Sequence, residues 1–123
     1  MTEKMKIIDF LRENQLDAIF VQKDENCRYL SKFTGSDSYL LLTKEELYLL
    51  TDSRYTEQAR KEAADYTVVD YKGHLAEIVA KLAGEYHIKT MGVETVFSYQ
   101  MYLSFHKYMP CLLYTSPSPR DTR

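Results

Sequence analysis

The 123-residue sequence contains no tryptophan, two cysteines, three prolines and four glycines. Cys111 lies in the last thirteen residues, whose composition differs from the rest, so Cys27 is the single thiol of the main part. This scarcity excludes a disulfide framework and a metal site built from paired cysteines. The four glycines are dispersed, which excludes a glycine-rich loop that cradles phosphate.

Long hydrophobic runs are also absent, and none approaches the roughly 20 residues of a membrane-spanning helix. The N-terminal stretch MTEKMKIIDFLRENQ has charges between its apolar residues, unlike the uninterrupted apolar segment of a signal peptide. Together with the single thiol, these features predict a soluble, cytoplasmic protein without a membrane partner.

An excess of basic charge is missing as well. The formal net charge is −2, and without Arg120, Asp121 and Arg123 it becomes −3, with 14 basic against 17 acidic residues. The charges are interspersed, so nucleic acid is not expected as a partner. The eleven tyrosines are therefore interpreted as core and interface residues rather than as a platform for stacking bases.

No catalytic motif is present in the sequence. His74, His87 and His106 form neither H-E-x-x-H nor another ligand pair, and there is no G-x-S-x-G. We interpret each histidine as a solvated or packed side chain. Arg28 could lower the pKa of Cys27, but a lone cysteine with no histidine near it in sequence is expected to be inert.

What is present is a regular alternation of helical and strand patterns, in a chain that is 45% hydrophobic and 28% charged. Such an alternation predicts an α/β fold, and a hairpin around Lys44–Glu46 makes the sheet mixed rather than all-parallel. The turn of this hairpin lacks glycine, so its type is left open. We expect helices over residues 2–14, 55–63, 75–84 and 98–107, a helical element within 24–38, and strands over 16–21, 39–43, 47–51, 67–70 and 89–93.

The end of the chain reads CLLYTSPSPRDTR and has no apolar period. A disordered tail is one interpretation, because Pro/Ser-rich termini are common. The other is that residues 111–121, back-translated, resemble the transposase adapter that is ligated to DNA before sequencing. We therefore expect one domain over residues 1–110, an adapter-derived or disordered tail over 111–123, and a natural protein that continues beyond Pro110.

One polar cluster stands where ligands bind in open α/β sheets. Asp52, Ser53, Arg54 and Tyr55 directly follow a predicted strand, at its carboxyl end. An arginine held there could bind a carboxylate with two parallel hydrogen bonds. From composition alone, a surface arginine paired with Asp52 or Glu57 is the simpler interpretation.

Three linked segments resemble the N-terminal domain of the creatinase / aminopeptidase P / prolidase family of "pita-bread" metallopeptidases. Residues 26–36, NCRYLSKFTGS, resemble the family pattern N-x-R-Y-L-[ST]-x-F-T-G-S. A hairpin of the SYLLLT…LYLLTDSRYTEQA kind follows, and Met91–Glu94 resembles [IV]-G-[FVI]-E. Each motif alone is weak, whereas their order and spacing over residues 1–110 are specific.

The resemblance implies a ribonuclease-H-like α/β fold, with a mixed sheet flanked by helices and no metal ligands. It implies no cofactor in this chain. In the family, a C-terminal metallopeptidase domain, which this chain lacks, holds two divalent metals, commonly Mn²⁺, Co²⁺ or Zn²⁺, through two Asp, one His and two Glu. A hydroxide that bridges these metals attacks the peptide bond preceding proline.

The resemblance also implies roles for single residues. In relatives such as creatinase, an N-domain arginine contacts the substrate carboxylate across the dimer, and by its position in DSRY this residue is Arg54. Tyr55 and Phe33 are weaker candidates for lining that cleft, and Phe33 is also expected as a core aromatic. Gly35 is expected to permit a tight turn. The structural motif comprises Asn26, Arg28, Tyr29, Gly35 and Asp52, of which Asp52 is expected to hold Arg54.

These observations predict the oligomerising and substrate-access domain of an Xaa-Pro aminopeptidase or dipeptidase, a hydrolase. We expect a homo-oligomer, in the simplest case a dimer, whose full-length form cleaves short proline-containing peptides, whereas this chain alone is inactive. The alternatives are a stand-alone, non-catalytic binding module of the same fold and an unrelated small α/β ligand-binding domain. Five metal ligands encoded after residue 110 would favour the peptidase, and a stop codon would favour the binding module.

Overall fold

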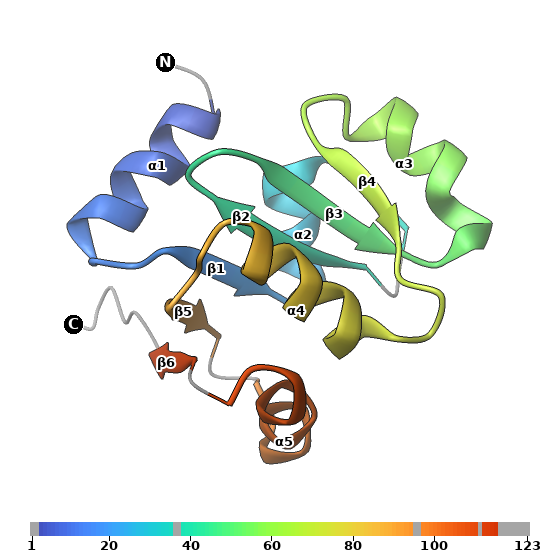
Figure 1. Ribbon diagram of the computed structural model, residues 1–123. Coiled ribbons are helices and arrows are strands. Elements are labelled where there is room, and N and C mark those ends of the chain that lie inside the picture. The colour runs from blue at the N-terminus through green and yellow to red at the C-terminus, as the bar shows by residue number, and fades with distance from the viewer. Residues whose placement is uncertain (1–2, 36–37, 95–96, 111, 116–123) are drawn as a thin grey trace.

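The computed structural model describes residues 3–35, 38–94, 97–110 and 112–115. In this part of the chain a six-stranded sheet carries helices on both faces (Figure 1). The strands are β1 (Ala18–Val21), β2 (Tyr39–Thr43), β3 (Leu47–Thr51), β4 (Thr67–Asp70), β5 (Thr90–Val93) and β6 (Leu113–Thr115). The helices are α1 (Glu3–Glu13), α2 (Asp24–Ser31), the 3₁₀ turn η1 (Ser53–Tyr55), α3 (Thr56–Glu62), α4 (Leu75–Glu85) and α5 (Tyr99–Tyr108).

The strand order is β4-β3-β2-β1-β5-β6, and the sheet is mixed. β2 runs antiparallel to both of its neighbours, β1 and β3. The β1–β5, β3–β4 and β5–β6 pairs are parallel. The carboxyl ends of β1, β3, β4, β5 and β6 therefore meet at one edge of the sheet, where the loops that follow them lie close together. The predicted α/β fold with a mixed sheet is confirmed.

Two hydrophobic cores lie on opposite faces of the sheet. One lies under α1, α2 and α3, and the other under α4 and α5. Along β2, for example, Leu40 and Leu42 belong to the first core and Leu41 to the second. A strand that is buried on both faces needs apolar residues at successive positions, which explains the uninterrupted runs in β2 and β3.

The predicted hairpin is confirmed with the same bounds, and so is the strand over residues 67–70. The turn between β2 and β3 needs no glycine because the Thr43 hydroxyl makes its stabilising hydrogen bonds. This oxygen accepts hydrogen bonds from the backbone N–H groups of Glu45, at 3.2 Å, and Glu46, at 2.8 Å. It also donates one to the Glu46 carbonyl at 2.8 Å. A threonine side chain thus supplies the turn contacts.

Helix boundaries differ from the predictions by a few residues. The helix expected over residues 55–63 starts earlier, as η1, and continues as α3. Ser98 caps α5 as predicted, since its Oγ accepts a hydrogen bond from Met101 N at 3.0 Å. Gly84 lies inside α4, and the left-handed residue beyond this helix is His87, with φ of 54°. The expected cap of α1, Thr2, lies outside the described residues.

The chain also contributes to the sheet beyond Pro110. Leu113–Thr115 form β6, which pairs with β5, and Leu112 is buried. The sheet thus includes residues that follow Pro110, while the expected domain boundary at residue 110 stays a prediction. The physical reason is that the outer edge of β5 offers unpaired N–H and C=O groups to any extended segment that follows α5. The adapter origin of residues 111–123 stays a prediction, and residues 111 and 116–123 lie outside the described part.

Candidate functional site

Asp52 and Arg54 form a polar pair directly after β3, at the carboxyl edge of the sheet. Asp52 has an extended backbone, with φ of −74° and ψ of 151°, and begins the 3₁₀ turn η1. Its Oδ1 accepts a hydrogen bond from Arg54 N at 2.9 Å and another from Arg54 Nε at 3.2 Å. Asp52 and Arg54 are thus in contact, and the role of Asp52 in holding Arg54 stays a prediction.

The electrostatics of this pair favour the ionised carboxylate. The pKa of Asp52 is lowered, first by the hydrogen bond from the backbone N–H of Arg54 and then by the Arg54 guanidinium. The Arg54 side chain is 67% exposed, and its Cζ lies 5.2 Å from the centroid of the Tyr55 ring. The guanidinium is thus guided by a carboxylate and an aromatic ring while it remains accessible from solvent.

Two aromatic residues, Phe33 and Tyr55, pack next to the Asp52–Arg54 pair. The rings of Phe33 and Tyr55 meet edge to face, with centroids 6.4 Å apart and planes at 68°. Phe33 is only 1% exposed. Its expected role in lining a cleft is therefore corrected, because a fully buried ring presents no surface to a substrate. The interpretation of Phe33 as a core aromatic holds, and the half-buried Tyr55 is the ring adjoining Arg54.

Gly35 is required by this packing. A Cβ at this position would stand closer to Cζ of the Phe33 ring than real contacts allow. This steric exclusion supports the expected structural role of Gly35, which stays a prediction. The structure brings together five of the predicted residues here: Phe33, Gly35, Asp52, Arg54 and Tyr55.

The other three motif residues belong to α2. Asn26 donates a side-chain hydrogen bond to the carboxylate of Glu94, at the end of β5. Arg28 and Tyr29 lie on the outer side of the helix, where Tyr29 is 75% exposed and the Lys32 ammonium lies 5.4 Å from its ring centroid. Asn26 therefore has a structural contact, whereas Arg28 and Tyr29 face outward from the same helix.

Sequence reasoning gave no role to three residues that hold the loops of this edge. Glu94 Oε1 accepts hydrogen bonds from Gln22 N at 2.6 Å and Lys23 N at 2.7 Å, in the link from β1 to α2. Glu62 and Gln58, both on α3, bind Thr34. Glu94 belongs to the motif at residues 91–94, and Gln58 and Glu62 share one face of a helix. Neither pattern predicts which residues these side chains contact.

The remaining candidates for chemistry are isolated. Burial raises the pKa of Cys27 to about 12, and the nearby charges of Glu94 and Asp24 contribute further. The sulfur lies 3.6 Å from each of two carbonyl oxygens that accept from it, those of Val21 and Ser38.

Within residues 3–35, 38–94, 97–110 and 112–115, no three His, Cys, Asp or Glu side chains gather as a metal site. No described helix is long and apolar enough to cross a membrane.

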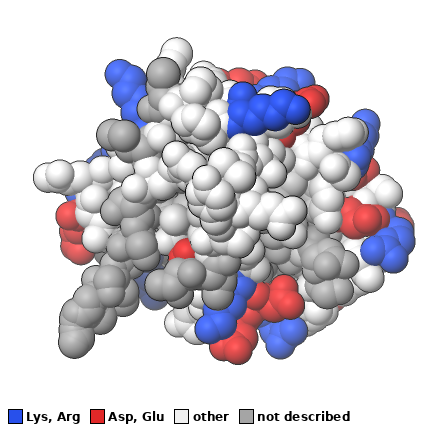
Figure 2. All heavy atoms as spheres, turned by 90° about the horizontal axis from the view of Figure 1, so that it is seen from below, with Lys and Arg blue, Asp and Glu red and all other residues white. Residues whose placement is uncertain are grey.

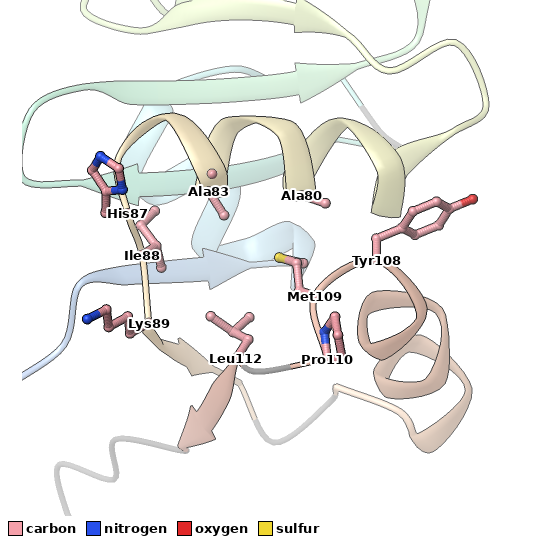
Figure 3. A pocket seen from close by; sticks show the side chains of 10 residues that line it. Ala80, Ala83, His87, Ile88, Lys89, Tyr108, Met109, Pro110 and Leu112 are labelled. Atoms are coloured by element: carbon pink, nitrogen blue, oxygen red, sulfur yellow. The ribbon is translucent and has the colours of Figure 1, made fainter.

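The larger hollows of the surface lie away from Arg54. One of ≈ 370 Å³ lies between α4 and the link from α5 to β6 (Figure 3). His87 and Lys89 stand at one end of it, and Tyr108 stands at the other. Another, of ≈ 340 Å³, lies between α1 and α2 and includes Ile7 and Leu30. Arg54 is instead on an open edge, so any ligand there needs a second surface to enclose it.

Uncharged side chains cover the middle of the face seen from below, with charged residues around its margin (Figure 2). α5 lies on this side of the molecule and exposes Tyr99, Leu103 and Tyr108. On the opposite face of the sheet, α1 exposes Met5 and Phe10. Exposed large apolar groups on several helices are typical of surfaces that contact other protein segments.

The described residues form an α/β domain, with helices on both faces of a mixed sheet and the Asp52–Arg54 pair at the carboxyl edge of that sheet. The profile described as Creatinase/Prolidase N-terminal domain matches residues 5–116. The chain belongs to this family. The family expected from residues 26–36, the hairpin and residues 91–94 is therefore confirmed.

Relatives in sequence are peptidases several times longer than this chain. The chain is 33% identical over 101 residues to the Xaa-Pro dipeptidase of Pyrococcus horikoshii. The aligned segment covers 80% of this chain and 27% of that protein. It is 29% identical over 91 residues to the uncharacterized peptidase YqhT of Bacillus subtilis, covering 73% of the chain and 26% of the relative. The chain thus spans about a quarter to a third of the curated relatives that it matches.

Solved structures show the same fold. The Xaa-Pro dipeptidase from Bacillus anthracis superposes with a TM-score of 0.80 at 31% identity, over 92% of this chain and 34% of that one. The N-terminal domain of the cytoplasmic peptidase PepQ from Mycobacterium tuberculosis superposes with a TM-score of 0.83 at 26% identity, over 98% of both chains. The second comparison shows that a domain of this size is crystallised by itself.

Proposed function

We propose that this chain is the N-terminal, oligomerising and substrate-access domain of a cytoplasmic Xaa-Pro aminopeptidase or dipeptidase. The full-length protein hydrolyses the bond that precedes proline in short peptides. Membership of the creatinase/prolidase N-terminal domain family and the Xaa-Pro dipeptidase relatives support this proposal. The proposal assigns a pair of divalent metals, Mn²⁺, Co²⁺ or Zn²⁺, to a C-terminal domain, as the resemblance to the metallopeptidase family implies.

The observation that carries the access role is the Asp52–Arg54 pair. An exposed guanidinium, guided by Asp52 and Tyr55 on an open edge, is suited to bind a peptide carboxylate with two hydrogen bonds. The enclosing surface comes from a second subunit in a homodimer. Exposed apolar side chains on α1 and α5 supply the area for such contacts.

The test compares two arginine variants of the full-length protein. Arg54→Ala is expected to raise KM for an Xaa-Pro peptide by at least about tenfold, the effect of losing a charge-assisted hydrogen bond. Arg60→Ala, which removes an exposed arginine from α3, is the matched control and is expected to keep the KM of the parent. Equal KM values for the parent, Arg54→Ala and the control would show that Arg54 does not bind substrate and is an ordinary surface charge.

The stand-alone binding module remains the competing function, and the DNA after codon 110 decides between them. Resequencing the source locus is expected to reveal an open frame that encodes two Asp, one His and two Glu as metal ligands. The purified 123-residue chain is expected to show no turnover with any added divalent metal. Turnover by this chain, or a native stop codon after CLLYTSPSPRDTR, would contradict the proposal.

A further inference from the structure

Thr34 joins the loop between α2 and β2 to the distant end of α3. Its backbone N–H donates a hydrogen bond to Glu62 Oε1 at 2.8 Å, and its hydroxyl donates one to the same oxygen at 2.9 Å. Gln58 Nε2 lies 3.3 Å from the Thr34 hydroxyl oxygen and 3.1 Å from Glu62 Oε2. One residue of the loop is therefore bound by two side chains that are neighbours on one helix face.

The carboxylate of Glu62 is adapted to this contact. The pKa of Glu62 is lowered, first by the Thr34 backbone N–H and then by the Thr34 hydroxyl, so the ionised form is the one that the loop binds. Gln58 occupies the second carboxylate oxygen, which fixes the plane of the group. The Glu62 anchor, by which we mean the hydrogen bonds of Glu62 and Gln58 to Thr34, thus combines an ionised acceptor with an oriented amide.

The same helix and the same loop carry the Arg54 site. The Arg54–Tyr55 pair stands at the beginning of α3, and the Glu62 anchor stands at its end. In the loop, Phe33 immediately precedes Thr34 and packs its ring against Tyr55. A displacement of Thr34 would therefore move Phe33, and through Phe33 the ring over which the Arg54 guanidinium lies.

We infer that Glu62, assisted by Gln58, is a positioning residue for Arg54. It holds the Thr34 loop against α3 and thereby fixes the Phe33–Tyr55 contact that orients the guanidinium. The inference rests on the proposed function in one respect, namely that the Arg54 surface is where a substrate carboxylate binds. Glu62 itself acts through the loop and does not touch a ligand.

The test is nuclear magnetic resonance of the 123-residue chain, with Glu62→Gln as the main variant. We expect amide exchange at Thr34 to rise about tenfold, which corresponds to the loss of one hydrogen bond. We also expect the Tyr55 ring signals and the Arg54 Nε–H signal to move, because their mutual geometry is released. Glu77→Gln, which neutralises an exposed glutamate of α4 on the other face of the sheet, is the matched control and is expected to leave all three readouts unchanged.

Thr34→Val is the second variant and removes the hydroxyl while it keeps the backbone N–H. It is expected to move the Tyr55 and Arg54 signals in the same direction as Glu62→Gln, by a smaller amount. Faster exchange at Thr34 with unmoved Tyr55 and Arg54 signals in both variants would overturn the inference and leave a purely local anchor. These readouts concern geometry alone, so they are independent of the KM test that decides the proposed function.

Discussion

Asn26 and Glu94 are joined by a side-chain hydrogen bond although they stand 68 positions apart in the sequence. The same carboxylate accepts hydrogen bonds from the backbone N–H groups of Gln22 and Lys23. The side chain at the N-terminal cap position of α2, Lys23, makes no capping hydrogen bond. Glu94, the residue that follows β5, therefore holds the chain segment that enters α2, but it does not replace an N-cap side chain, which would accept from N–H groups further into the helix.

Removing this acceptor is expected to weaken the domain. Glu94→Ala leaves two backbone donors and the Asn26 amide without their partner, which is expected to lower the free energy of unfolding by about 2–3 kcal/mol. Urea denaturation monitored by circular dichroism measures the change. Glu45→Ala, in the exposed hairpin turn, is the control and is expected to change stability by less than about 0.5 kcal/mol. Equal effects of the two substitutions would show that Glu94 is not an anchor.

Two glycines are expected to respond in opposite directions to the same substitution. Gly35→Ala forces a Cβ into the Phe33 ring and is expected to destabilise the domain by about 1–3 kcal/mol. Gly84→Ala places a Cβ in open space within α4 and is expected to stabilise it by about 0.5–1 kcal/mol. Thermal unfolding of the two variants side by side measures this contrast. A stabilised Gly35→Ala would contradict the packing of Phe33 described above.

The Asp52 carboxylate is expected to titrate below its ordinary pKa of 3.8. As pH falls, the unfolded state binds this proton before the folded state does. The contribution of Asp52 to stability is therefore present above the ordinary pKa and is lost as pH falls through the folded one. Carbon-detected NMR titration of the carboxyl group measures the midpoint. In Arg54→Gln it is expected to rise only part of the way, because the main cause, the backbone N–H of residue 54, remains.

The thiol of Cys27 is expected to be unreactive in the folded domain. With a pKa raised to about 12, about one molecule in ten thousand carries the thiolate at about pH 8, against roughly a quarter of free cysteine. Labelling with iodoacetamide in a Cys111→Ser chain is expected to be slow in buffer and fast in denaturing urea. Rapid labelling of the folded chain would show that the sulfur is accessible and ionised.

The sequence predicted the sheet because its strands have a simple chemical signature. The two hairpin strands were placed to the residue, since strands buried on both faces require unbroken apolar runs. β4, a half-buried edge strand, was placed to the residue by its β-branched residues. The Asp52–Arg54 contact was also predicted, because its partners are two positions apart on one turn. β6 was not predicted, since residues 113–115 carry no pattern of their own and acquire strand geometry from the edge of β5.

The anchors that hold the candidate site were not predictable in the same way. Glu62 meets Thr34 across 28 positions, and Glu94 meets Asn26 across 68. From the sequence, a carboxylate on a polar helix face or at a strand end is interpreted as a solvent-exposed side chain. In the folded structure, backbone N–H groups that are distant in sequence donate hydrogen bonds to it. The three-dimensional structure, rather than any local spacing, makes these two glutamates parts of the site.

The parallel pairing of β1 with β5 has a consequence for how the domain forms. Ala18 faces Met91 across these strands, and Asp17 accepts hydrogen bonds from the backbone of Lys89 and Thr90. On a ribosome, the three strands β1 to β3 emerge and can associate while β5 is still unmade. The start of α2 has no Glu94 until then. The β1–β5 pairing is therefore expected to form only once roughly three quarters of these residues are synthesised, and the core beneath α5 is expected to form later still.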